Sequence, residues 1–202
     1  MERVSLGVTG GVPLGRVTPG HSVDKEESRR YTLGPSVDLS LTGKWSVTVN
    51  PLYKRTGSTV AYPAYFFDPG PDSAVQFGNQ PSRMRSHSLE LPVIGKYQFG
   101  RDHSRWRPFV GTGFAFQTAW QEASNRYVTR AKDTGALTFF DNTFSRRTAT
   151  DTGVILSTGL TFRRGPLQFS PEIRYTRWGS ASPARNRHQA DALLTIRFGG
   201  KR

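Results

Sequence analysis

The chain has 202 residues, a formal net charge of +13 and no cysteine. Its mean hydropathy of −0.53, without any run of about 20 apolar residues, excludes a helical membrane protein. A membrane β-barrel stays open, because its hydrophobic signal is spread over alternating strands. The lack of cysteine excludes disulfides and cysteine-based metal sites; we expect no other metal site and no cofactor. The excess of arginine and lysine indicates acidic partners.

The alternation of apolar and polar residues predicts a single all-β domain over residues 1–202. Successive side chains of a strand point to opposite faces, and the stretch ADALLTIRF at 190–198 has an apolar face and a face with Asp191 and Arg197. The same pattern predicts eight strands, over residues 3–16, 31–42, 45–55, 87–99, 106–120, 152–163, 167–177 and 190–198. Because Met1 leads almost directly into a strand, we expect a mature chain with an added start methionine.

The connections between these strands alternate in length. Short connections fall at 43–44, 100–105 and 164–166, and long ones at about 17–30, 56–86, 121–151 and 178–187. In an up-and-down barrel, alternate connections leave the same end, so the long loops share one end and the short turns and both termini share the other. We therefore expect an eight-stranded antiparallel transmembrane β-barrel with short periplasmic turns and long extracellular loops, which is typical of bacterial outer membranes.

The charged faces of the strands are expected to fill the lumen. An eight-stranded barrel is only wide enough for side chains, and a buried charge must be paired or it costs several kcal/mol. We therefore expect an ion-pair network that plugs the lumen, with four acids against four bases. Its members are Asp38, Glu90, Glu172 and Asp191 with Lys96, Arg107, Arg174 and Arg197.

The apolar faces carry two groups of aromatic residues with aliphatic residues between them. The groups are Trp45, Tyr97, Phe99, Trp106, Phe162, Phe169 and Phe198 near the short turns, and Tyr31, Tyr53, Trp120 and Tyr175 near the long loops. Two aromatic girdles around an aliphatic band are typical of a face that crosses a bilayer. Pro35, Pro92 and Pro171 lie inside strands, although proline cannot donate to a ladder, so we expect irregular pairing at each.

Four stretches connect the chain with a known family. They are SLELPVIGKYQFG (88–100), RPFVGTGFAF (107–116), PEIRYTRWG (171–179) and ADALLTIRF (190–198). In these stretches the chain resembles the PorT-like group of bacterial outer-membrane β-barrels, relatives of the small OmpA- and OmpX-type barrels. The resemblance implies the fold, the outer membrane as location, and insertion by the barrel-assembly machinery, whose C-terminal signal the last stretch resembles, with Phe198 as the aromatic residue. It implies no shared reaction.

Arginines gather at the expected loop end, and we predict that some of them bind lipid phosphate. The guanidinium fork suits phosphate oxygens, although a generic solvated basic surface accounts for the same residues equally well. The candidates are Arg29, Arg30, Arg83, Arg85, Arg146, Arg147, Arg185 and Arg187. We expect no nucleic-acid partner, because the aromatic residues and the charges occupy opposite faces.

The leading interpretation is an integral outer-membrane protein, expected to be monomeric, whose long basic loops contact lipopolysaccharide, a surface polymer or a protein. A lipid-modifying outer-membrane enzyme is an alternative, because Ser86, His87, Ser88 and His188 fall near the outer rim. Neighbouring strand residues point to opposite faces, however, so we assign no catalytic residue. The other alternative is a soluble lipocalin-like barrel that binds a small apolar ligand, in which the apolar faces would point inward.

Overall fold

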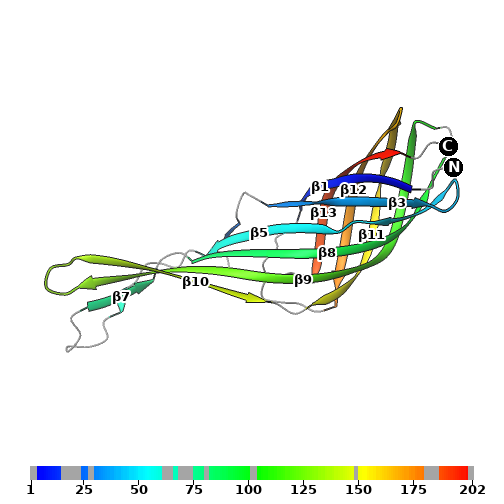
Figure 1. Cartoon of the computed structure of the whole chain (residues 1–202). Helices are drawn as coiled ribbons and strands as arrows, with labels where there is room; N and C mark the ends of the chain where they lie inside the picture. Colours follow the sequence, from blue (N-terminus) through cyan, green and yellow to red (C-terminus); the bar gives the residue numbers. More distant parts are fainter. Residues whose placement is uncertain are drawn as a thin grey trace.

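The computed structural model describes residues 4–14, 24–26, 30–60, 66–67, 75–79, 82–100, 104–147, 150–179 and 187–199. The thirteen strands within these ranges belong to one sheet. Figure 1 shows a barrel that continues at one end into a long extension. Over these described ranges, no helix is long and apolar enough to cross a membrane.

Eight antiparallel strand positions form the barrel wall. They are β1 (Val4–Pro13), β3 (Tyr31–Ser40), β4 (Trp45–Val49) continued by β5 (Leu52–Val60), β8 (Ser82–Gln98), β9 (Trp106–Ala131), β11 (Asp151–Arg164), β12 (Leu167–Trp178) and β13 (His188–Gly199). The first and last strands pair from Ser5↔Gly199 to Pro13↔Asp191, which closes the wall. The predicted eight-stranded antiparallel barrel is confirmed.

The two ends of the barrel differ as the loop lengths predict. Both termini lie at one end (Figure 1), where the turns 41–44 and 165–166 also join neighbouring strands. We call this the turn end. We call the opposite end, where the extension begins, the loop end.

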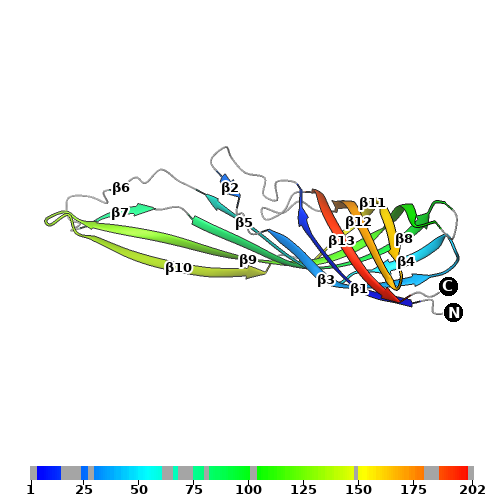
Figure 2. The same ribbon diagram turned by 90° about the horizontal axis from the view of Figure 1, so that it is seen from above.

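Much of two predicted long loops is sheet. The strands β5, β8 and β9 run past the barrel, and β10 (Leu137–Arg147) pairs with β9. Three short strands complete the extension, which Figure 2 shows from above: β2 (Asp24–Glu26), β6 (Phe66–Phe67) and β7 (Val75–Asn79). At about 3.3 Å per residue, the part of β9 beyond Trp120 is about 35 Å long. The sequence pattern missed these strands, because a strand outside the membrane needs no alternation between a lipid face and a lumen face.

The side chains point as the membrane interpretation requires. Leu194 and Phe198 on β13 are 45% and 60% exposed, whereas Arg174 and Glu90 are 2% and 4% exposed. The apolar face therefore points away from the barrel axis, and the charged face points into the lumen. This orientation contradicts the soluble lipocalin-like alternative, in which the apolar face would enclose the ligand.

The prolines inside strands coincide with interruptions in strand pairing. β3 pairs with β5 up to Leu33↔Tyr53 and with β4 from Val37↔Val49, and Pro35 faces Pro51 in the gap between them. Neither proline has an N–H to donate. Pro92 lies next to the same gap, where its carbonyl accepts a hydrogen bond of 3.2 Å from the Asn50 N–H.

Pro171 lies at a second interruption. The pairing of β11 with β12 stops at Gly159↔Glu172 and resumes at Phe162↔Phe169, so Pro171 falls between the paired segments. The missing proline N–H therefore coincides with the missing part of the ladder, and the register is the same on both sides of it.

A glycine in β9 lets two strands approach closely, and this generates a testable prediction. A Cβ on Gly113 would overlap the carbonyl oxygen of Val93, whereas a Cβ on Gly95 would lie 3.8 Å from the Thr112 oxygen. We expect Gly113→Ala to lower the free energy of unfolding by about 1–3 kcal/mol, measured by urea unfolding in phospholipid vesicles. Gly95→Ala is the matched control on the facing strand, with a change of about 0.5 kcal/mol or less. Equal effects of the two substitutions would contradict the close-approach explanation.

Candidate functional site

The lumen holds a charge cluster nearest the loop end that is centred on Lys54. Its Nζ lies 2.7 Å from a carboxylate oxygen of Glu90 and 2.7 Å from one of Asp191. Gln117 donates a hydrogen bond of 2.9 Å to Glu90. All four side chains are buried, and the cluster crosses the lumen from β5 to β8, β9 and β13.

A second cluster fills the middle of the lumen. Lys96 and Arg174 both contact Glu172, at 2.6 and 2.9 Å. Arg174 also donates to Asn50 at 3.4 Å, and the Lys96 Nζ lies 4.5 Å from the ring centroid of Phe109. Because one acid faces two bases, the amide oxygen and the aromatic ring provide further acceptors for the excess positive charge.

Towards the turn end, Asp38 faces Arg197 at 3.9 Å and accepts a hydrogen bond from Thr48. Arg197 donates to Ser36 at 3.5 Å. Arg107 donates to the carbonyl of Gly43, so it contacts the turn that joins β3 and β4.

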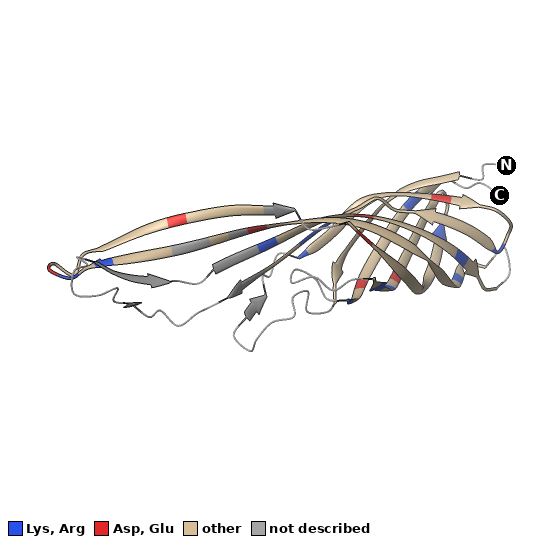
Figure 3. Ribbon diagram, turned by 90° about the horizontal axis from the view of Figure 1, so that it is seen from below, with Lys and Arg blue, Asp and Glu red and all other residues tan. Residues whose placement is uncertain are grey.

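All eight residues predicted for the lumen are buried there; Figure 3 shows how charged residues recur along the barrel strands. Their partners differ in part from the prediction. Glu90 and Asp191 contact Lys54, which the predicted network omitted. Alternation shows which face a residue occupies, but not which residues meet across the lumen.

The lumen also holds an apolar cluster that the sequence pattern did not predict. Ile94, Ala115, Ile155 and Trp178 pack together, each at most 1% exposed. Each takes the lumen parity of its strand, which we interpreted as the polar face. These apolar side chains therefore share the interior with the charge clusters.

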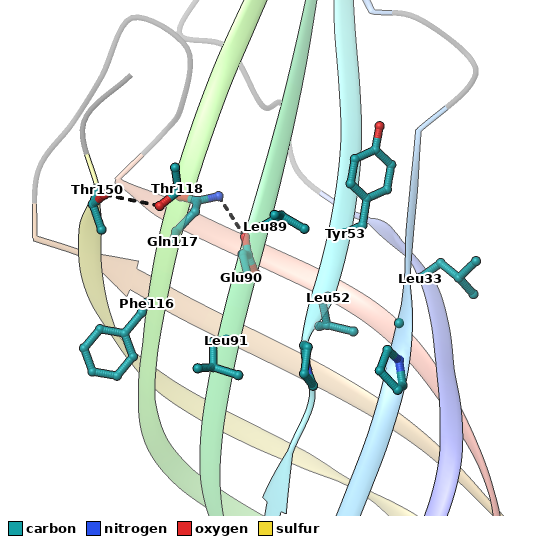
Figure 4. Close-up of a pocket in the computed structure, with 13 residues that line it drawn as sticks. Leu33, Leu52, Tyr53, Leu89, Glu90, Leu91, Phe116, Gln117, Thr118 and Thr150 are labelled. Atoms are coloured by element: carbon teal, nitrogen blue, oxygen red, sulfur yellow. Dashed lines mark hydrogen bonds between the residues drawn. The ribbon is translucent and has the colours of Figure 1, made fainter. Parts of the chain in front are cut away.

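The outer wall has a hollow near the loop end, which we call the notch (Figure 4). Its volume is about 460 Å³. Two neighbouring rows of outward residues across β3, β5, β8 and β9 line it, together with the inward row between them and Thr150. The row nearer the membrane centre is Pro35, Pro51, Leu91 and Phe116; the row nearer the rim is Leu33, Tyr53, Leu89 and Thr118; the inward row is Gly34, Leu52, Glu90 and Gln117.

The next row towards the loop end, which we call the rim row, consists of Tyr31, Arg55, His87 and Trp120. His87 and Trp120 are stacked at 5.8 Å, and His87 Nδ1 shares a hydrogen bond of 2.5 Å with the Tyr53 hydroxyl. The rings of Tyr53 and Tyr31 lie 6.1 Å apart. One chain of contacts thus joins three residues of the predicted girdle, Tyr31, Tyr53 and Trp120. His87 is the member of this chain that was not predicted.

The fourth predicted aromatic of this end repeats the arrangement elsewhere on the rim. The Tyr175 hydroxyl shares a hydrogen bond of 2.5 Å with His188 Nδ1, and Arg177 faces His188 in the β12–β13 register. The sequence therefore has Tyr-x-Arg on one strand with a histidine opposite the arginine at two places, Tyr53–Arg55 with His87 and Tyr175–Arg177 with His188.

The girdle at the turn end is also a set of ring contacts. Trp45 contacts Tyr97 at 5.0 Å, and Tyr97 contacts Phe99 at 5.0 Å. Trp106, Phe162 and Phe169 form a second chain at 4.5 and 6.5 Å. Phe198 is exposed on the same outer face.

A family model described as an outer membrane protein beta-barrel domain matches residues 1–179. The chain belongs to this family. It is therefore a protein of the bacterial outer membrane, in which the turn end is periplasmic and the loop end is extracellular. The finer assignment to the PorT-like group stays a prediction.

A solved outer-membrane barrel shares this fold, and others are similar to the chain over most of its length. Neisserial surface protein A is 13% identical, with 96% of this chain and 95% of that chain covered and a TM-score of 0.50. The N-terminal barrel domain of OprF from Pseudomonas aeruginosa is 13% identical, with 97% and 96% covered and a TM-score of 0.47. Ail from Yersinia pestis is 10% identical, with 96% and 94% covered and a TM-score of 0.43. A search of curated proteins found no match.

The serines beside His87 do not join it in this outer-membrane barrel. Ser88 is buried on the lumen side and Ser86 has the same parity, whereas His87 faces outward and contacts Tyr53, Trp120 and Glu122. A nucleophile and its base must lie within hydrogen-bond reach, so these serines and His87 do not form such a pair.

The predicted phosphate-binding arginines are found at the extracellular side where the structure describes them. Arg30 precedes β3, Arg83 and Arg85 lie in β8, Arg146 and Arg147 end β10, and Arg187 precedes β13. Arg29 and Arg185 lie outside the described residues. Arg55 also lies at this end, opposite His87 and with the outward parity of Tyr53.

The cluster around Lys54 generates a stability prediction. Lys54→Met leaves the buried Glu90 and Asp191 without their shared cation, so we expect the free energy of unfolding to fall by about 3–5 kcal/mol. Urea unfolding in vesicles, followed by tryptophan fluorescence, measures it. Lys44→Met, in an exposed turn, is the control, with a change of about 0.5 kcal/mol or less.

A triple variant shows whether K54M is unstable because charges are left unpaired or because side-chain packing is changed. If unpaired charge is the cause, K54M/E90Q/D191N recovers much of the stability that K54M loses, because no carboxylate is left uncompensated. A triple variant as unstable as K54M would contradict the ion-pair explanation.

Proposed function

We propose that this outer-membrane barrel has a closed lumen and acts at the cell surface, where its basic rim contacts phosphate groups of lipopolysaccharide. The observation that carries the proposal is the placement of Arg55 and Arg85. Both face outward at the extracellular rim, Arg55 in the rim row and Arg85 in the row beyond it. The aromatic side chains of the rim row have the position that aromatic belts take at the headgroup level.

The surroundings of these arginines suit a lipid phosphate. Arg55 faces His87, and Arg85 faces Gly57 and Glu122 across the two neighbouring strands. Glu122 also lies 3.9 Å from His87, so one acid stands among two arginines and an imidazole. A guanidinium has five N–H donors, which lets it contact a protein group and a phosphate oxygen together.

The filled lumen supports a surface role rather than transport. The charge clusters around Lys54 and Glu172 and the apolar cluster with Trp178 occupy successive parts of the interior. Ion flow would require these buried charges to separate, and an unpaired buried charge costs several kcal/mol.

Closure of the lumen can be tested by conductance. We expect the refolded protein, inserted in planar bilayers, to give no stepwise currents at neutral pH, because paired side chains occupy the path. A heat-dependent shift in gel mobility verifies that the inserted protein is folded. Regular single-channel steps from the folded protein would contradict the closed lumen.

Two double variants test the phosphate contact. Each removes two positive charges, one variant at the loop end and the control at the turn end. We expect R55Q/R85Q to weaken lipopolysaccharide binding in neutral detergent about tenfold, equivalent to about 1.4 kcal/mol, measured by titration calorimetry. Wild-type binding should also weaken as salt rises. The control R105Q/R164Q removes the same charge from the periplasmic turns, where both residues are exposed, and should bind as the wild type does. Equal affinity of all three proteins would contradict the proposed function.

A further inference from the structure

We infer that the notch holds one acyl chain of the lipopolysaccharide molecule whose phosphate contacts Arg55 and Arg85. This inference rests on the proposed function and adds a lipid-chain site to it. The two parts are contiguous, because the rim row that contains Arg55 directly follows the notch row that contains Tyr53 and Leu89.

The notch lies where the proline pair interrupts the ladder. Pro35 and Pro51 face each other on β3 and β4–β5, and neither can donate the ladder hydrogen bond that would join the strands there. Gly34, beside them, lets the two strands approach closely, because a Cβ at that position would overlap the Pro51 carbonyl oxygen. The two prolines and Gly34 all line the hollow, which therefore coincides with the interrupted part of the wall.

The lining changes from apolar to polar in the direction that a lipid requires. The row nearer the membrane centre, Pro35, Pro51, Leu91 and Phe116, carries no side-chain hydrogen-bonding group. Nearer the rim, Thr118 and Thr150 are hydrogen-bonded to each other at 3.2 Å (Figure 4). These hydroxyls lie on the side of the notch that faces the rim, with Arg55 and Arg85 beyond them.

The inward row of the notch does not require a polar ligand. Glu90 accepts a hydrogen bond from Gln117 and contacts Lys54, so its carboxylate is already compensated. The cavity of about 460 Å³ lies within the range of about 300–1,000 Å³ for small-molecule sites and opens towards hydrocarbon.

The free energy that an acyl chain gains in the notch is expected to come from closer packing, not from transfer of the chain out of water. Lipid chains are as apolar as leucine, so a chain that enters the notch gains van der Waals contacts with a wall that would otherwise be poorly packed. Such a gain is small alone. It becomes specific when a phosphate on the same molecule is already bound, because the chain then has a high effective concentration at the notch.

Filling the notch tests the inference. Leu89→Trp and Leu33→Trp each place an indole in the hollow from a different strand, and gel mobility identifies which variants fold. We expect either folded variant to bind lipid A about tenfold more weakly than the wild type in neutral detergent. The control Leu156→Trp, on the outer face of β11 where Leu156 is 56% exposed, should bind as the wild type does.

A second probe separates the chain from the phosphate. The deacylated, phosphorylated glucosamine disaccharide should bind the notch-filled variants and the wild type equally, and should bind R55Q/R85Q more weakly. If lipid A binds the notch-filled variants as tightly as the wild type while R55Q/R85Q loses affinity, the chain site is wrong and the phosphate contact stands. If R55Q/R85Q retains full affinity for both probes, the proposed function itself is wrong.

Discussion

The structure depends on one constraint, namely that a backbone polar group facing hydrocarbon must find its partner within the protein. An unsatisfied group costs several kcal/mol in the bilayer core, and an open sheet edge would expose a full row of them. The pairing of β1 with β13 removes that edge. Once the wall is closed, the pleat of each strand sends alternate side chains to the lipid and to the lumen, so the charges have only the interior to occupy.

The interior then requires charge pairs that are specific in three dimensions. Lys54 holds two carboxylates from different strands, and Glu172 holds two cations. Lys54–Asp191 and Lys96–Glu172 join strands that are far apart along the chain, so these pairs cross-link the wall from within, whereas Arg174 and Glu172 lie on the same strand. Where pairing of the wall is interrupted, at Pro35 and Pro51, the same interior residues lie behind the gap, and Glu90 is bonded to both Lys54 and Gln117 there. The wall can thus carry a hollow without exposing a bare charge.

The sequence predicts the features that depend on alternation along a strand. It does not predict contacts between side chains of strands that meet across the lumen. Parity along each strand placed Asp38, Arg174 and their companions in the lumen and Trp45 and Tyr53 on the outer face. It could not show that Lys54 joins Glu90 to Asp191, because that depends on strand register and tilt around the barrel. Ile94 and Trp178 were missed because a single apolar residue on an otherwise polar strand face looks like an exception to the alternation. The sequence does not show that such residues from different strands pack together. β10 was missed because both of its faces are exposed to water, so apolar and polar residues need not alternate along it.

The length of the β9–β10 hairpin has an electrostatic consequence. Its tip carries Lys132 and Asp133 and lies about 35 Å along β9 from Trp120, whereas mobile ions screen charges over about 8 Å at physiological ionic strength. The tip is therefore several screening lengths away from the rim row, so the charges at the tip and those at the rim act on their surroundings independently.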